Sequence, residues 1–261
     1  MFKFIDVHSH LNLPEFDADR EEQIKKLEEL NIGTITVGVD YETSKEAVLL
    51  ADENPNIWAT VGLHPTDNDK EVFDYQKYKE LAQHKKVIAI GECGLDYFHP
   101  GDKEKQKDLF IKQIELAIEI NKPLMLHCRP SKGSMDAYED TLEILTTMSR
   151  RSLDMRGNAH FFVGNINIAK RFLNLGFTMS FDGPITFSRD YDEVIKYLPL
   201  ESILSETDSP FAAPMPYRGK RNEPAYVEEI VKKIAEIRGE DFEKVREVLV
   251  QNAMRVFKLS I

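Results

Sequence analysis

Six side chains that could bind a metal ion are spread over most of this chain, and each lies at or just beyond the end of a short apolar run. These are His8, His10, Glu92, His127, His160 and Asp208. Apolar runs of this length are typical of buried β-strands. Side chains at the ends of several strands can meet at one point only if the strands lie side by side with the same ends together. The pattern therefore predicts a barrel of aligned strands with a metal centre at one end.

Short β-rich runs alternate with amphipathic stretches along the whole chain, which is the pattern of repeated βα units. Within Lys103–Ile120, for example, Phe110, Ile114 and Ala117 recur at helical spacing. The sequence thus predicts an α/β fold, a (β/α)8 TIM-type barrel with the metal site at the C-terminal face of the strands. The eight expected strands are Lys3–His8, Gly33–Val39, Ile57–Leu63, Val87–Gly91, Pro123–His127, Asn158–Phe161, Phe177–Phe181 and Ser202–Ser205.

The length of the chain favours one barrel over several domains. Its 261 residues match a single eight-fold barrel of about 250 residues, and 42% hydrophobic residues support a large core. Asn222 and Pro224 predict the start of a helix and Gly239 its end, and a last helix is expected at Phe242–Phe257. No linker or low-complexity tract divides residues 1–261, so we expect a single domain. Longer irregular connections are expected at Arg129–Met135, Arg150–Gly157 and Thr207–Glu223.

Composition limits the location and the partners of the protein. The chain begins directly with a strand pattern and has no run of about 18 apolar residues, so we expect a cytoplasmic protein that does not enter a membrane. Cys93 and Cys128 each follow a candidate ligand, and strand alternation favours buried thiols over a disulfide. A net charge of -11 argues against a broad nucleic-acid surface, but not against a narrow site for a strand end or a small anion. The sequence does not specify an oligomeric state, and we favour a monomer.

The spacing of the candidate ligands supports a metal site. His8 and His10 are two residues apart, so both side chains project from one face of an extended segment. Glu92 follows the apolar run Val87–Gly91, where a carboxylate is costly unless it is paired or binds a metal ion. Each candidate alone has an ordinary structural explanation, such as a hydrogen-bonded histidine, a salt bridge or a helix cap. Four of the seven histidines fall in this one set, however, and the combination favours a shared centre.

The types of ligand indicate divalent metal ions. Imidazole suits zinc, iron, nickel and copper, whereas carboxylate oxygens suit magnesium and manganese. The mixed set can hold two ions, with Glu92 placed to bridge them. Two ions about 3.5–4 Å apart can activate water and stabilise the attacking and leaving oxygens in a displacement at phosphorus. We therefore expect two divalent ions, with Mg²⁺, Mn²⁺ and Zn²⁺ as the candidates.

Longer motifs around these residues resemble the TatD family of metal-dependent deoxyribonucleases, within the amidohydrolase-like barrels. The resemblance covers essentially the whole chain. Its most specific motifs are GECGLDYF, SETDSPFAAP and RGKRNEPAYV, together with FIDVHSHLN, FDADR, VGLHP, PLMLHCR and QNAMRVF. It implies a metal-dependent phosphodiesterase that acts mostly on DNA, with 3′-to-5′ exonuclease activity on DNA ends in some members.

The resemblance also implies a role for each ligand. It implies two groups that share Glu92: His8, His10 and Asp208 around one ion, and His127 and His160 around the other. Asp208 and Glu92 are the implied catalytic residues, because Asp208 would orient or deprotonate the attacking water and Glu92 would bridge the ions.

Two stretches depart from the usual family pattern. The chain reads His160-Phe-Phe-Val-Gly164 where a His-Cys-Phe-Ser-Gly-like turn is usual. It also reads Arg129-Pro-Ser-Lys-Gly133 where an Arg-Asp-Ala-like sequence is common. Both differences bear on substrate preference more than on metal binding.

Basic side chains near the expected strand ends are candidates for binding a substrate phosphate. Arg129 lies two residues after His127, and its guanidinium can grip phosphate oxygens at two points. Arg218 and Arg221 lie in a basic cluster after the eighth expected strand, where such barrels often bind phosphate, although a solvated charge run explains the cluster equally well. His64 ends a further expected strand and could donate to the same anion.

Three aromatic residues are expected in the loops around the same end of the barrel. Tyr97, Phe98 and Phe211 could stack a terminal base, or they could simply pack the loops.

The leading hypothesis is a nuclease that removes nucleotides from DNA ends by metal-activated attack of water on phosphorus. The alternative keeps the metal site but makes the protein a hydrolase of esters or amides, such as a deacylase that acts on mischarged aminoacyl-tRNA. For a small neutral substrate, Arg129 and the Arg218–Arg221 cluster would have no role. A binding protein with a degenerate site is a third interpretation, against which all six ligands are present.

Overall fold

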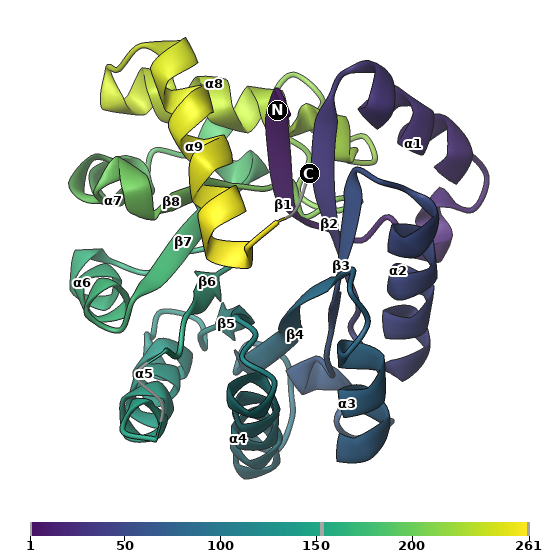
Figure 1. The fold of residues 1–261 in the computed structure, drawn as a ribbon. Coiled ribbons are helices and arrows are strands. Elements are labelled where there is room, and N and C mark those ends of the chain that lie inside the picture. The colour runs from purple at the N-terminus through teal and green to yellow at the C-terminus, as the bar shows by residue number, and fades with distance from the viewer. Residues whose placement is uncertain (1, 152–153, 260–261) are drawn as a thin grey trace.

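The chain folds into a ring of parallel strands surrounded by helices, seen along the barrel in Figure 1. The structure is a computed structural model that describes residues 2–151 and 154–259, so residues 152–153 of the expected connection Arg150–Gly157 and the two chain ends lie outside it. Within the described residues, eight strands pair in parallel in chain order, which confirms the predicted (β/α)8 TIM-type barrel. They are β1 (Phe4–Ser9), β2 (Ile32–Val37), β3 (Ile57–Val61), β4 (Val87–Asp96), β5 (Leu124–Arg129), β6 (Gly157–Ala159), β7 (Phe177–Phe181) and β8 (Ile203–Ser205).

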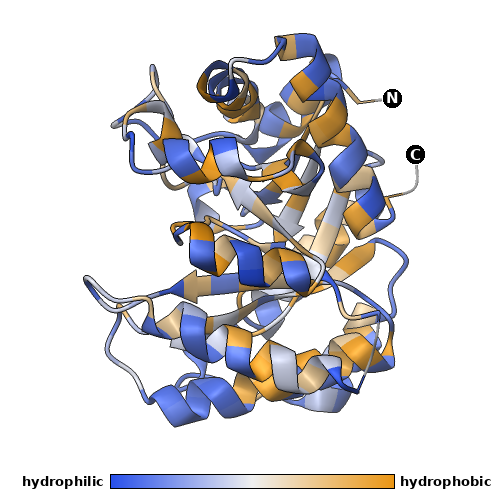
Figure 2. Cartoon of the chain, turned by 90° about the vertical axis from the view of Figure 1, so that its left-hand side faces the viewer, coloured by the Kyte–Doolittle hydropathy of each residue, from blue (hydrophilic) through white to orange (hydrophobic). Residues whose placement is uncertain are grey.

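Helices follow the strands and cover the outside of the barrel. The helices in view combine hydrophobic and hydrophilic residues, as expected when one face packs on the strands (Figure 2). Within the described residues, no helix is long and apolar enough to cross a membrane. The α-helices are α1 (Arg20–Glu29), α2 (Tyr41–Glu53), α3 (Tyr75–Ala82), α4 (Lys103–Glu119), α5 (Asp136–Ser149), α6 (Ile166–Asn174), α7 (Asp192–Tyr197), α8 (Val227–Arg238) and α9 (Phe242–Phe257). Short 3-10 helices are η1 (Pro14–Phe16), η2 (Pro65–Asp67), η3 (Gly183–Thr186), η4 (Leu200–Ser202) and η5 (Pro224–Tyr226).

The barrel closes between its first and last strands. A parallel bridge joins Ser9 to Ser209 just beyond the end of β8. The amide of Asp208 donates to the carbonyl of His8 at 2.9 Å, and the amide of His10 donates to the carbonyl of Ser209 at 2.7 Å. Closure of the barrel thus places His8 and His10, the first predicted ligands in the chain, beside Asp208, the last one.

Strand β4 is longer than the sequence predicts. The expected strand ends at Gly91, but β4 continues to Asp96, so Glu92 lies inside the strand and not beyond it. Pairing with β5 resumes after a register shift. Gly94 (φ 138°) has no Cβ, and this lets β4 approach the carbonyl oxygen of His127, which would lie only 2.1 Å from an added Cβ. Cys93 on this strand and Cys128 on β5 are buried free thiols, as predicted.

Asn222 does not begin a helix as predicted. Its side-chain amide donates to the carbonyls of Thr207 and Phe211, at 2.7 and 2.6 Å, and so connects two parts of the loop between β8 and α8. Pro224, the other residue of the predicted start, does begin a helical turn: the 3-10 turn η5 starts there and leads directly into α8. The predicted end at Gly239 (φ 65°) and the last helix Phe242–Phe257 are confirmed.

Helix α9 covers the end of the barrel at which the strands begin (Figure 1). Val250 and Phe257 of α9 join Ile5 and Trp58, the second residues of β1 and β3, in one buried apolar cluster. The amide of the buried Asn252 donates to the carbonyls of Leu200 and Ile203, at 2.8 and 2.9 Å, and so fastens α9 to the start of β8.

We expect Asn252→Ala to destabilise the protein, because it leaves two buried carbonyls without their donor. The free energy of unfolding should fall by about 2–4 kcal/mol in urea denaturation. The neighbouring Gln251 is exposed on the same helix, and Gln251→Ala should change the value by less than about 0.5 kcal/mol. Equal losses for the two variants would contradict this role of Asn252.

The loop before α8 is also fastened to α1. The guanidinium of Arg221 donates to both carboxylate oxygens of Asp19, at 2.7 and 2.5 Å, and to the carbonyl of Glu15. The Arg221 guanidinium lowers the pKa of Asp19 from 3.8 to about 2.

The ion pair between Asp19 and Arg221 should stabilise the protein in a pH-dependent way. Because the folded-state pKa of Asp19 is lowered, its contribution is complete above pH 3.8 and is lost as the pH falls towards about 2. Asp19→Asn should therefore lower the free energy of unfolding by about 1 kcal/mol at pH 7. Urea unfolding of both proteins between pH 7 and pH 3 should show the difference shrinking at the acid end. As a control, Asp17→Asn should change the free energy of unfolding little, because the Asp17 side chain that pairs with Arg20 is 67% exposed. A difference for Asp19→Asn that does not vary with pH would argue against the ion pair.

Candidate metal centre

A cavity of about 610 Å³ opens at the end of the barrel where the strands end. Five of the six predicted ligands line it, and the sixth, His8, is completely buried beside them. The five are His10, Glu92, His127, His160 and Asp208. The structure therefore brings together all six side chains that the sequence singles out.

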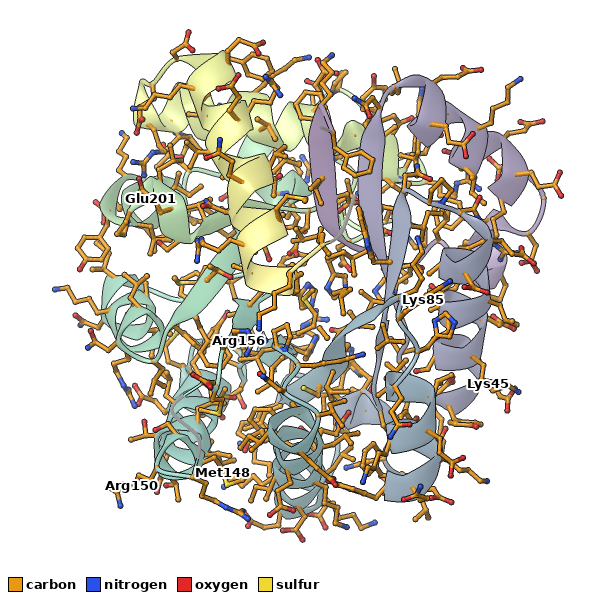
Figure 3. The ribbon with its side chains drawn as sticks, viewed as in Figure 1. Lys45, Lys85, Met148, Arg150, Arg156 and Glu201 are labelled. Atoms are coloured by element: carbon orange, nitrogen blue, oxygen red, sulfur yellow. The ribbon has the colours of Figure 1, made fainter. Side chains whose placement is uncertain are left out.

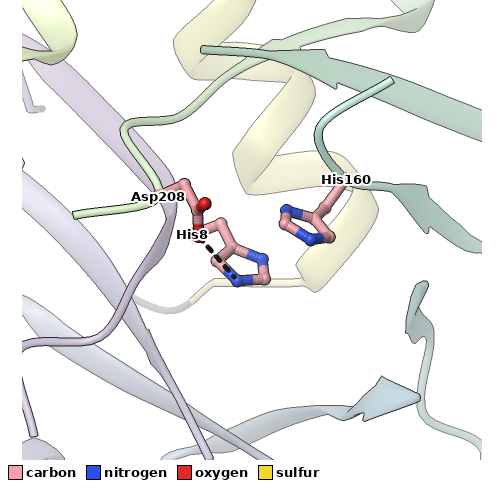
Figure 4. A group of neighbouring side chains, drawn as sticks. All are labelled: His8, His160 and Asp208. Atoms are coloured by element: carbon pink, nitrogen blue, oxygen red, sulfur yellow. Dashed lines mark ion pairs between the residues drawn. The ribbon is translucent and has the colours of Figure 1, made fainter. Parts of the chain in front are cut away.

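Three of these side chains show how distant strand ends converge (Figure 4). His8 belongs to β1, His160 follows β6, and Asp208 follows β8. The rings of His8 and His160 stack with centroids 3.8 Å apart, and Nε2 of His8 lies 3.7 Å from Oδ1 of Asp208. Asp208 has a left-handed backbone (φ 54°), and its hydrogen bond to the carbonyl of His8 holds this conformation. Such backbone conformations are costly for residues other than glycine and are concentrated at functional sites.

Glu92 lies at the centre of the group. Its Oε2 is 3.4 Å from Nε2 of His8 and 3.8 Å from Nε2 of His10. Its Oε1 is 2.6 Å from Nδ1 of His127 and 3.0 Å from Nε2 of His160. Each oxygen of this one carboxylate therefore faces a different pair of histidines.

The contact between His8 and His10 fits a bound cation. Nδ1 of His10 donates to the carbonyl of Val37 at 3.1 Å, so a neutral His10 presents the lone pair of Nε2. That Nε2 lies 3.2 Å from Nε2 of His8 and 3.4 Å from Oδ1 of Asp208. A cation shared by these atoms satisfies all of them. Four overlapping groups of side chains have ligand atoms close enough to hold an ion: His8, His160 and Asp208; His8, His10 and Glu92; Glu92, His127 and His160; and His64, Asp96 and His127.

The two carboxylates of the set are ionised. Burial alone raises the pKa of Glu92, but the imidazoles around it, first that of His160, hold its pKa well below the usual value. For Asp208, burial is again outweighed, chiefly by its hydrogen bond with His10, and its pKa is lowered. These carboxylates raise the pKa of His160 and His10 in turn, against the effect of burial. Since a proton and a metal ion compete for the same nitrogens, metal binding releases protons from such a site.

Two carboxylates that the sequence analysis missed orient the histidines. Glu206 is fully buried; its Oε1 lies 3.4 Å from Nδ1 of His160 and accepts from the amide of Phe161 at 2.5 Å. Its Oε2 accepts from the hydroxyl of Ser180 at 2.6 Å. Asp96 lies 3.1 Å from Nε2 of His127. Carboxylates in this position fix the orientation of a metal-binding imidazole and raise its basicity.

A third carboxylate, Asp6, joins β1 to the segment after β8. It accepts from the amide of Thr207 at 2.9 Å and from its hydroxyl at 2.7 Å. Burial raises its pKa well above the usual value. Asp6 and Glu206 each precede a predicted ligand, His8 and Asp208, by two residues. Asp6 and His8 both lie in β1, so the two-residue repeat of a strand was the signal in the sequence that could have identified Asp6. Glu206 and Asp208 lie beyond the end of β8, where this repeat does not apply.

His64 lies at the same cavity, as predicted. Burial, and then the neighbouring His127, lowers its pKa to about 3, so the ring is neutral at physiological pH. Nδ1 accepts from the amide of Thr66 at 3.3 Å. The ring proton is therefore on Nε2, which lies 3.6 Å from Oε1 of Glu92.

The arginines predicted to bind phosphate occupy different places. Arg129 lines the cavity. In the part of the chain that the structure describes, the cavity lining does not include Arg218 or Arg221. Arg221 is engaged by Asp19, and Arg218 lies over the ring of Phe187, with Cζ 4.1 Å from the ring centroid.

The three aromatic residues that were expected near the mouth also differ in their exposure and in their contacts. Tyr97 is 7% exposed and its hydroxyl donates to Asp140 at 2.7 Å, so it packs the loop. Phe98 is 51% exposed beneath the guanidinium of Arg129. Phe211 is 48% exposed and lines the cavity, with its ring 5.9 Å from that of His10.

Comparison with known proteins agrees with this geometry. Residues 5–258 match the family model described as TatD related DNase. The chain is 38% identical over 260 residues to the uncharacterized metal-dependent hydrolase YabD of Bacillus subtilis, covering 98% of this chain and 99% of that one. It is 31% identical over 266 residues to the 3'-5' ssDNA/RNA exonuclease TatD of Pectobacterium parmentieri, covering 98% and 99%.

Solved structures show the same similarity. YJJV, a TatD homolog from Escherichia coli, has a TM-score of 0.89 and 27% sequence identity, with 99% of each chain covered. The chain therefore belongs to the TatD-related DNase family and is a TatD-family metal-dependent hydrolase.

Proposed function

We propose that this protein is a metal-dependent phosphodiesterase that removes nucleotides from DNA ends in the 3′-to-5′ direction. The observation that favours this function most is the position of Glu92, whose two oxygens face two groups of histidines beside a cavity that also contains Arg129. A shared carboxylate of this kind suits a pair of divalent ions, for which Mg²⁺, Mn²⁺ and Zn²⁺ are the candidates.

The ligands divide into two groups around Glu92. His8, His10 and Asp208 would hold one ion, and His127 and His160 the other. Bound divalent ions supply a lowered pKa for water and a positive charge that offsets the charge of the reacting phosphate. The chain itself orients the ligands, through the carbonyl of Val37 on His10, Glu206 on His160 and Asp96 on His127.

Asp208 is the residue that we assign to the proton transfer. Its side chain is 13% exposed, and it lines the cavity in ionised form. As the water oxygen bonds to phosphorus, Asp208 accepts the proton that the water loses. The bond from phosphorus to the leaving oxygen breaks, and the leaving oxygen takes up a proton from solvent to become a hydroxyl group. A carboxylate that is held ionised next to the attacking water is suited to this role.

Arg129 and His64 are the groups that we assign to the substrate phosphate. The guanidinium of Arg129 is exposed and, within the described residues, has no carboxylate partner. It can therefore offer two parallel N–H groups to phosphate oxygens. His64 adds a neutral Nε2–H donor beside Glu92, with its ring centroid 4.3 Å from that of His127.

The charge of the chain and the name of one relative support a nucleic-acid end as the substrate. With a net charge of -11, the chain is unsuited to a broad grip on DNA, so recognition would be confined to the cavity. The Pectobacterium relative is named a ssDNA/RNA exonuclease. Hydrolysis of a small neutral ester or amide, the alternative from the sequence, would leave Arg129 without a role.

Removal of the metal should abolish the activity. Protein treated with a chelator should not shorten 5′-labelled single-stranded DNA, and added Mg²⁺, Mn²⁺ or Zn²⁺ should restore a ladder of products shortened from the 3′ end. Glu92→Gln should lower the restored rate by about 100-fold or more, since it removes the shared carboxylate. His84→Ala, a histidine outside the cavity, is the control. No shortening with any of the three ions, or hydrolysis of esters alone, would contradict the proposal.

Replacing Arg129 should weaken binding of DNA. Arg129→Ala removes a charge-assisted contact to phosphate, so kcat/KM for single-stranded DNA should fall by about 10- to 100-fold. The loss should be mainly in KM, and Arg129→Lys should restore part of it. Arg221→Ala is the matched control, because its guanidinium is engaged by Asp19. Unchanged kinetics for Arg129→Ala would exclude a phosphate contact at this residue.

A further inference from the structure

We propose that Phe187 and Arg218 form a second nucleotide-binding site on the rim of the cavity. Single-stranded DNA would then be held across the mouth of the barrel, and not only by the terminal nucleotide at the metal centre. This inference rests on the proposed function, because the strand that it describes is the one cleaved at the metal centre.

The first observation is the pairing of arginines. The chain has 12 arginines, and 45 acidic residues compete for its 34 basic ones. Among the described residues, nine arginines donate a hydrogen bond or form an ion pair through the guanidinium. The other three are Arg129, Arg150 and Arg218. Two of these three lie where strands end: Arg129 is the last residue of β5, and Arg218 lies in the loop after β8.

The second observation is that these two arginines have the same surroundings. Cζ of Arg129 lies 4.2 Å from the centre of the Phe98 ring, and Cζ of Arg218 lies 4.1 Å from that of Phe187. Phe98 is 51% exposed and Phe187 40%. Stacking on the ring holds the guanidinium flat while its N–H groups stay free at the edge.

The second pair is fixed to the wall of the cavity. Phe187 directly follows Thr186, whose hydroxyl accepts from the amide of Met215 at 2.8 Å. In the same turn, Gly183 packs so closely on Ala212 that an added Cβ would lie 1.7 Å from its carbonyl oxygen. Ala212 itself lines the cavity. The loop after β7 and the loop after β8 therefore form one rigid rim that bears Phe187 and Arg218.

The two pairs are suited to bind single-stranded DNA. In the first pair, Phe98 follows β4 and Arg129 is the last residue of β5. The second pair lies on the loops after β7 and β8, on a different side of the mouth. Each combines a cation for a phosphate with a ring or guanidinium plane on which a base can stack, and this combination repeats along a polynucleotide. A mononucleotide or dinucleotide bound at the metal centre needs only the first pair, whose Arg129 lines the cavity.

The test compares substrates of different length on the metal-loaded enzyme. Bis(p-nitrophenyl) phosphate and the dinucleotide dTpdT should require only the metal centre and the Arg129 side, whereas a dT 12-mer should reach the second pair. Arg218→Ala and Phe187→Leu should each raise KM for the 12-mer about tenfold, with kcat unchanged and with KM for dTpdT unaffected. Arg218→Ala should also reduce the slope of log kcat/KM against log salt concentration by about 0.7 for the 12-mer.

Arg150 provides the matched control. It is likewise exposed and without an ion pair among the described residues, but it follows α5 at the edge of the molecule (Figure 3). Arg150→Ala should leave KM and the salt dependence for the 12-mer unchanged. Turnover of dTpdT shows that each variant is folded.

The outcomes separate this inference from the proposed function. Arg218→Ala and Phe187→Leu that behave like Arg150→Ala on the 12-mer would overturn the second site while leaving the nuclease in place. An equal rise in KM for dTpdT and the 12-mer would also overturn it, because the pair would then act on the metal centre. Failure of the wild-type enzyme to cleave any of the three phosphodiesters would overturn the proposed function, and the second site with it.

Discussion

Closure of the barrel between β1 and the segment after β8 is the interaction on which the centre depends. The amides of His10 and Asp208 each donate across this seam, to Ser209 and His8. The same two hydrogen bonds that complete the ring of strands therefore place three ligands within reach of one another. Asp6 reinforces the seam through Thr207 from a fully buried position. A shift of one residue at this junction would turn the ligands away from the cavity, because alternate residues of a strand face opposite sides.

The centre brings buried charge together, which is costly without compensation. Glu92, Glu206 and Asp96 are almost completely buried, and the structure compensates each with imidazoles or backbone amides. The lowered pKa of Glu92 shows that the surrounding imidazoles outweigh the cost of burial. Such a cluster is poor at stabilising a fold but well suited to hold cations. The unfavourable free energy of burying these charges is offset by apolar packing elsewhere in the barrel, including that of α9 at the opposite end.

The sequence anticipated the barrel and the six ligands, because strands and strand ends leave local signals of apolar runs followed by polar residues. It missed Asp6, Asp96 and Glu206, whose partners come from other parts of the chain, although Asp6 lies in β1 two residues before the predicted ligand His8. It also did not separate Arg218 from Arg221, which lie in one basic cluster and differ in their neighbours in space. Arg221 meets Asp19 and Arg218 meets Phe187, and neither contact has a signature in local sequence.

The sequence by itself determined which residue types stand at the ends of which strands, and hence the fold class and the kind of centre, because hydrophobic periodicity and ligand chemistry are local properties of a chain. Only the tertiary structure decided how Glu92 divides its oxygens between two groups of histidines, which carboxylates orient them, and which arginines remain free. The physical reason is that hydrogen bonding, burial and ion pairing depend on neighbours that the fold brings together from distant parts of the chain.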